Sequence, residues 1–121
     1  MLVKNTAHYN MQFYDSYVII ERISEFTVDS KLAKETLKTI VDHFKGKEFV
    51  IISNRKQNYS LNAESYSPGL FKKVKGIAVV SENEDMKAQA VLEQLNFDNS
   101  FAFFNKIEDA QNWAESFSYS Y

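Results

Sequence analysis

The sequence contains no cysteine, a single proline and only three glycines. The absence of cysteine excludes a disulfide framework, a thiolate nucleophile and a thiolate metal site. With so little proline and glycine, the chain has little room for a flexible linker or a low-complexity segment. No apolar run approaches membrane-spanning length, and the first residues lack the apolar core of a signal peptide, so we expect a cytoplasmic protein without a transmembrane segment.

Strong charge of either sign is also missing. Lys and Arg together number 14 and Asp and Glu 16, which gives a formal net charge of -2 at pH 7. A weakly acidic chain lacks the sequence-independent attraction to phosphate backbones, so nucleic acid is not an expected partner.

What the chain does have is enough apolar sequence for one core. Hydrophobic residues make up 45% of its 121 residues, and 10 Phe and 7 Tyr are among its aromatic side chains. We therefore expect a single domain over residues 1–121, with 1–7 and 118–121 as the segments that are loose.

The hydrophobic pattern alternates between strand and helix after an opening hairpin. The helix that follows residues 82–85 is expected to use Met86, Ala90, Val91 and Leu95 as its apolar face. The expected elements are strands at 8–14 and 17–23, a helix ending near 44, a strand at 48–53, a short helix within 62–75, a strand at 76–81, a helix after 82–85, a strand at 101–104 and a helix capped by Asn105.

This order, β-β-α-β-α-β-α-β-α, predicts an α/β fold. Strands that are joined through helices run parallel to one another, and the hairpin adds one antiparallel strand. We expect a mostly parallel sheet of about five strands, with the helices packed on it.

Two segments resemble a known family. Lys75-Gly76-Ile77-Ala78-Val79-Val80-Ser81 is similar to the fourth strand of STAS domains, the family of sulfate-transporter domains and anti-sigma-factor antagonists. Phe104, followed by Ile107-Glu108-Asp109-Ala110-Gln111-Asn112-Trp113, resembles the closing strand and helix of its SpoIIAA-like branch. The resemblance extends from about Met11 to Ser116, and it implies a SpoIIAA-like fold and a regulatory role without catalysis.

The chain departs from that family at its regulatory loop. Anti-sigma-factor antagonists carry a phosphorylated serine in an Asp-Ser pair after the third strand. Here the corresponding segment reads Ser53-Asn54-Arg55-Lys56-Gln57-Asn58-Tyr59-Ser60, without that pair. Ser53, Ser60, Ser65 and Ser67 are each chemically able to accept phosphate, but none lies in the family's motif, so the phosphorylation switch does not carry over from the resemblance.

The same loop is the best candidate for a binding site. A buried strand that ends in a long polar loop marks the edge at which α/β proteins usually bind ligands. Arg55 is suited to bidentate pairing with a carboxylate or phosphate, so a small anionic or polar ligand is the expected partner. The alternative is a solvated loop that satisfies its own hydrogen bonds. The candidate ligand-binding residues are Asn54, Arg55, Lys56, Tyr59, Ser60 and Ser67.

No catalytic or metal site is expected. His8 and His43 are the only histidines, and neither has further ligands at a metal-binding spacing. The sequence contains no Gly-x-Ser-x-Gly segment, and the acids at Glu82, Glu84 and Asp85 suit a helix N-terminus. We therefore expect no enzyme and no cofactor.

The sequence favours a non-catalytic STAS-like module that regulates or binds a small ligand. Two alternatives stay open. The aromatic content and the related CRAL-TRIO architecture suggest a carrier of lipids or other hydrophobic ligands. The C-terminal aromatics, Tyr119 and Tyr121 included, suggest a protein-interaction module, most simply a homodimer.

Overall fold

The computed structural model describes residues 2–6, 8–23, 30–55, 70–95, 97 and 99–117. Within these ranges the chain forms six strands, three α-helices and a short 3₁₀ helix. In chain order they are β1 (Leu2–Asn5), β2 (Tyr9–Phe13), β3 (Tyr17–Arg22), α1 (Ser30–Phe44), β4 (Phe49–Asn54), η2 (Leu70–Lys73), β5 (Val74–Val80), α2 (Glu84–Gln94), β6 (Ser100–Phe104) and α3 (Ile107–Ser116).

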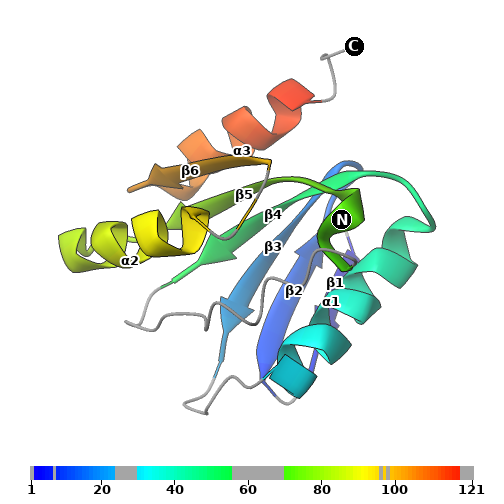
Figure 1. Cartoon of the computed structure of the whole chain (residues 1–121). Coiled ribbons are helices and arrows are strands. Elements are labelled where there is room, and N and C mark those ends of the chain that lie inside the picture. Colours follow the sequence, from blue (N-terminus) through cyan, green and yellow to red (C-terminus); the bar gives the residue numbers. More distant parts are fainter. Residues whose placement is uncertain are drawn as a thin grey trace.

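The six strands form one sheet whose spatial order is the same as their order in the chain. The strands from β3 to β6 pair in parallel, and β2 pairs antiparallel with both β1 and β3. Only β2 therefore runs against its neighbours, and β1 and β6 lie at opposite edges of the described sheet (Figure 1). The predicted α/β class, with a mostly parallel sheet and one antiparallel strand, is confirmed.

The extra strand is β1, in a segment that was expected to be loose. Leu2 pairs with Phe13 and Asn5 with Asn10, and all four residues of β1 are exposed. Four exposed residues bury too little surface to leave a hydrophobic pattern, so backbone pairing with β2 places this strand at the edge. The short helix expected within 62–75 corresponds to η2, and its expected start at Ser67 lies outside the described residues.

Helices cover both faces of the sheet. In Figure 1, α1 and α2 lie on one side of the strands and α3 lies on the other. On the first side, Leu37, Ile40 and Phe44 of α1 and Met86 and Ala90 of α2 belong to one buried cluster. On the second side, a smaller cluster gathers Tyr17, Val50, Ile52, Ala78, Val80, Ala110 and Ala114.

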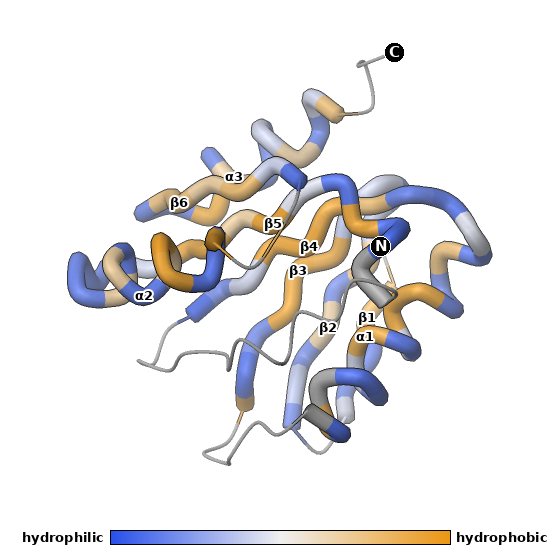
Figure 2. The backbone as a smooth tube through the Cα atoms, in the orientation of Figure 1, coloured by the Kyte–Doolittle hydropathy of each residue, from blue (hydrophilic) through white to orange (hydrophobic). Residues whose placement is uncertain are grey.

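Apolar side chains on both faces make β4 and β5 the centre of the molecule. Figure 2 shows hydrophobic sequence along both strands, and Phe49–Ser53 and Gly76–Val80 are buried without interruption. Continuous apolar runs of this kind are typical of parallel strands that are covered on both sides. The carboxyl ends of these strands are thereby held at one edge of the sheet.

α3 packs closely on β5 because position 76 has no side chain. A Cβ on Gly76 would lie 2.9 Å from a ring carbon of Trp113 and 3.2 Å from the ring of Phe117. The glycine therefore permits both aromatic rings to lie directly against the strand. None of the helices in the described part of the chain is long and apolar enough to cross a membrane.

Candidate functional site

The carboxyl ends of β4, β5 and β6 meet at one edge of the sheet. Beyond the strands, the Arg55 N–H donates to the Val80 carbonyl at 2.8 Å, and the Ser81 N–H donates to the Phe104 carbonyl at 3.1 Å. These bonds keep the three chain segments in register as they leave the sheet. This is the edge at which parallel α/β sheets generally bind their ligands.

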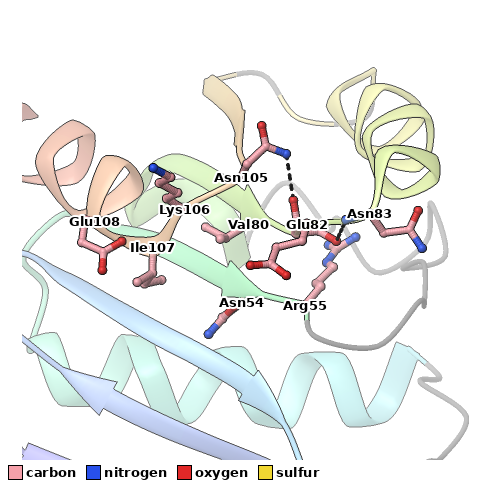
Figure 3. A pocket seen from close by; sticks show the side chains of 10 residues that line it. Asn54, Arg55, Val80, Glu82, Asn83, Asn105, Lys106, Ile107 and Glu108 are labelled. Atoms are coloured by element: carbon pink, nitrogen blue, oxygen red, sulfur yellow. Dashed lines mark hydrogen bonds between the residues drawn. The ribbon is translucent and has the colours of Figure 1, made fainter.

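A cavity of about 770 Å³ lies at this edge. Its volume falls within the range that is typical of small-molecule sites. Its walls come from the ends of three strands, from the segment that leads into α2 and from the first turn of α3, as Figure 3 shows. The described residues that line it are Asn54, Arg55, Val80, Ser81, Glu82, Asn83, Asn105, Lys106, Ile107 and Glu108.

Hydrogen bonds fix the shape of the rim of the cavity, which is formed by the lining residues that follow β5 and β6. The Asn105 side chain donates from Nδ2 to the Ser81 carbonyl at 3.1 Å, which ties the end of β6 to the end of β5. The Ser81 hydroxyl accepts from the Asn83 N–H at 3.1 Å, and Asn83 Oδ1 accepts from the Asp85 N–H at 2.9 Å. Asn83 is therefore the N-cap of α2, and it anchors that helix to the rim.

Charge at the rim is mixed. Glu82 and Glu108 add carboxylates to the lining of the cavity, and Lys106 adds an ammonium group. All three residues are exposed, so their charges face solvent at the mouth. With two acids and one exposed base around it, the described rim does not favour a simple anion.

Arg55 has a different role from the one expected. The residue is only 2% exposed, and its NH1 and NH2 groups donate to the two carboxylate oxygens of Glu93, each at 2.6 Å. Its Nε donates to the Ser53 hydroxyl at 3.0 Å. The sequence-based expectation that Arg55 pairs with a bound anion is therefore corrected: the guanidinium is engaged by a buried acid of α2.

The hydrophobic pattern did not predict the Arg55–Glu93 ion pair, because it does not place a glutamate on the buried face of a helix. Met86, Ala90 and Glu93 follow one another at helical spacing, and all three are buried on the inner side of α2. The expected apolar face was partly wrong, because Val91 is 51% and Leu95 79% exposed. A glutamate on an otherwise apolar stripe, together with an arginine at the end of a strand, is the signal that could have identified the pair.

Of the remaining candidate residues, only Asn54 lies within the described part of the chain. Asn54 ends β4 and lines the cavity together with Arg55. Lys56, Tyr59, Ser60 and Ser67 lie outside the described residues.

Sequence reasoning did not select the polar residues that follow β5 and β6. The signal was present, because Ser81, Glu82 and Asn83 directly follow an apolar strand, and Asn105 and Lys106 follow the next one. Residues after neighbouring parallel strands necessarily lie at the same edge of the sheet.

The histidines lie away from this cavity. The His43 ring stacks near Phe13, with 4.0 Å between ring centroids, at the end of α1. Within the described ranges, no three residues among His, Asp and Glu form a group that could hold a metal ion.

The Tyr17 hydroxyl has a raised pKa. Burial raises its pKa above the ordinary value of 10.0, and the nearby carboxylate of Glu115 adds to the increase. Its hydroxyl donates to Glu115 Oε1 at 3.3 Å and accepts from Gln111 Nε2 at 3.3 Å. This group ties β3 to α3 and does not line the cavity.

The order of the elements, the single sheet and the helices on both of its faces define a protein with a SpoIIAA-like fold. No protein-family model matches the chain, and no curated protein matches it. Among solved structures, the chain is similar to an uncharacterised protein of the DUF3478 family from Shewanella loihica PV-4, which has a SpoIIAA-like fold. The two chains are 17% identical, the match covers 92% of this chain and 98% of the other, and the TM-score is 0.64. The fold expected from the resemblance is therefore confirmed.

Proposed function

We propose that this protein is a non-catalytic regulatory module that binds a small polar ligand in the cavity at the carboxyl ends of β4, β5 and β6. The observation that carries the proposal is the cavity of about 770 Å³, whose described walls consist mainly of amide and charged side chains. Pockets that bind specifically present a few fixed polar groups. Asn83 and Asn105 are held in place here by hydrogen bonds within the rim.

The charges around the cavity favour a ligand that carries a positive group. Arg55 is neutralised by Glu93, so the exposed charges of the described lining are the two carboxylates of Glu82 and Glu108 and the single ammonium group of Lys106. An amine or a zwitterion would complement this arrangement better than phosphate, because its cation would lie between two acids. The asparagine amides would supply both donors and acceptors to the rest of the ligand.

The composition of the cavity argues against catalysis and against lipid carriage. Its described lining includes neither histidine nor cysteine, and the Ser81 hydroxyl already accepts a backbone hydrogen bond. A nucleophile with an adjacent base is therefore not found among the described residues of the lining. Val80 and Ile107 are the apolar residues of the described lining and the other eight are polar or charged, which suits a polar ligand better than a lipid chain.

An NMR titration tests the proposed function. The probes are putrescine as a dication, L-lysine as a ligand with an additional amine, and inorganic phosphate as an anion. The amine probes should shift the backbone amide signals of Asn83, Asn105 and Lys106 in a saturable way. The double variant Glu82→Gln, Glu108→Gln should weaken that response at least tenfold, since both carboxylates are lost.

The matched control is Glu35→Gln, because Glu35 is an exposed acid on α1 away from the cavity. This variant should titrate like the wild type. A larger response to phosphate than to the amines would contradict the charge assignment. Shifts that spread over the surface without saturation would contradict a binding site at this cavity.

A further inference from the structure

β6 lies at an edge of the sheet and has an unusually apolar sequence for that position. Among the described residues it pairs with β5 on one side and with no strand on the other. Its five residues, Ser100-Phe101-Ala102-Phe103-Phe104, include no charge and no proline. Edge strands are normally protected from pairing with other chains by charge, proline or a bulge. The opposite edge, β1, carries Lys4.

The hydrogen bonds to β5 determine which backbone groups of β6 face outward. Phe104 pairs with Val80, and its carbonyl accepts from the Ser81 N–H at 3.1 Å. Bonding direction alternates along a strand, so Ala102 and Ser100 also point their N–H and C=O groups toward β5. The N–H and C=O groups of Phe101 and Phe103 therefore point away from the sheet.

These outward groups are symmetric about Ala102. The residues on its two sides are both phenylalanine, so the segment Phe101-Ala102-Phe103 reads the same in both directions. We propose that β6 pairs antiparallel with β6 of a second copy of this chain, with a two-fold axis at Ala102. Phe101 then lies opposite Phe103 of the partner subunit, and each such pair exchanges two backbone hydrogen bonds.

The side chains at this junction fit the symmetric arrangement. Phe101 and Phe103 both belong to the side of the sheet that α1 and α2 cover, and both are only partly buried. Aromatic residues directly opposite each other across an antiparallel pair stabilise it. Ala102 occupies the axis on the α3 side, where its methyl group leaves space for the second copy. No charge on β6 is brought near its own copy, so the pairing incurs no repulsion within the strand.

The pairing goes beyond the ligand-binding proposal and leaves the cavity free. The carboxyl end of β6 leads into Asn105, which lines the cavity. Because the two copies of β6 run in opposite directions, their carboxyl ends lie at opposite ends of the paired strands. The two cavities therefore lie at opposite ends of the junction. In this register, Asn105 of each copy lies opposite Asn99 of the partner subunit.

Cysteine cross-linking tests the register directly, because the chain has no cysteine of its own. In Ala102→Cys, the two introduced thiols form a non-hydrogen-bonded antiparallel pair with Cα atoms about 4.5 Å apart, within the range for a disulfide. Most of this variant should become a covalent dimer under mild oxidation. Ser100→Cys is the matched control, since its two copies are offset by four residues, or about 13 Å. Val3→Cys places a thiol on β1, at the opposite edge of the described sheet, and should likewise cross-link much more slowly than Ala102→Cys.

Hydrogen exchange provides a test without mutation. When the wild-type protein is more concentrated than the dissociation constant of the dimer, the Phe101 and Phe103 amides should exchange as slowly as the Ala102 amide, which points toward β5. On dilution, the two outward amides should exchange at least tenfold faster while that of Ala102 remains protected. A wild type that sediments as a monomer at every concentration would overturn the proposal. Cross-linking of Ser100→Cys or Val3→Cys as fast as Ala102→Cys would overturn it as well.

Discussion

Arg55 and Glu93 form an ion pair inside the protein, where charge is costly to place. Both side chains are nearly inaccessible, and the pair is bidentate, with both N–O distances at 2.6 Å. A buried pair of this kind contributes little net stability, because desolvation offsets most of the attraction. The main effect of the ion pair is to hold the end of β4 against the inner side of α2, beside the cavity.

Removing one partner of this pair should be far more harmful than removing both. Glu93→Leu leaves an unpaired buried guanidinium and should lower the free energy of unfolding by about 3–5 kcal/mol. The double variant Arg55→Met, Glu93→Leu should recover most of that loss, because no charge remains buried. Urea unfolding of the single variants and the double variant measures this difference.

A surface pair supplies the control for this experiment. Lys38 and Asp42 also form an ion pair, at 3.2 Å, but their side chains are 74% and 64% exposed. Lys38→Ala should change the free energy of unfolding by less than about 1 kcal/mol. If Glu93→Leu had as small an effect as Lys38→Ala, the buried pair would not be present in solution.

Tyr17 should make the protein sensitive to alkaline pH. Burial raises the pKa of its hydroxyl above 10.0 in the folded state, so the folded protein holds this proton more tightly than the unfolded chain does. The resulting stabilisation is complete below the unfolded pKa and is lost as pH rises through the folded pKa. The free energy of unfolding of the wild type should therefore fall more steeply above about pH 10 than that of Tyr17→Phe. Urea titrations at a series of pH values from neutral to strongly alkaline would show parallel curves if Tyr17 were not buried.

The hydrophobic pattern predicted most strands and helices, and it failed at β1 and at part of the face of α2. β4 and β5 were identifiable because they are apolar on both faces. The face of α2 was partly misassigned because its inner side includes Glu93 while Leu95 is exposed on its outer side. Periodicity assigns apolar residues to the interior, and here an ion pair reverses that assignment at one position.

The contact between α3 and β5 depends on Gly76. Gly76→Ala would bring a Cβ to 2.9 Å from the Trp113 ring, so α3 must shift or the ring must rotate. We expect a loss of about 1–3 kcal/mol in the free energy of unfolding. Trp113 is the single tryptophan of the chain, so a change in its fluorescence emission would report the displacement directly.

Gly46 provides a control that separates packing from backbone strain. It has a positive φ of 87°, and a Cβ there would meet nothing within 4 Å. Gly46→Ala should cost about 1–2 kcal/mol through its left-handed backbone, with the Trp113 emission unchanged. An equal emission change in both variants would mean that Gly76 does not control the position of α3.

At the scale of the whole molecule, the sequence was sufficient for the fold and only partly sufficient for the site. Alternating strands and helices leave few arrangements once crossovers are right-handed, so the mixed sheet could be derived. The edge at which the cavity lies was also predicted, through Asn54. The remaining lining residues come from two further segments, after β5 and after β6. The order of the strands places these segments at the same edge, but it does not show which of their side chains line the cavity. The partner of Arg55 depended likewise on a contact 38 positions away in the chain.

Joining two copies through β6 would produce an elongated particle, which X-ray scattering can distinguish from a compact dimer. A single domain of this length should have a radius of gyration of about 14 Å, and a compact particle of twice the length about 18 Å. Six strands at about 4.8 Å each separate the centres of two edge-joined domains by about 29 Å, which raises the radius to about 20 Å. The cross-linked Ala102→Cys dimer and the concentrated wild type should share this larger value. A wild-type dimer near 18 Å would mean that the two copies associate through their helical faces, and the free edge of β6 would then need another explanation.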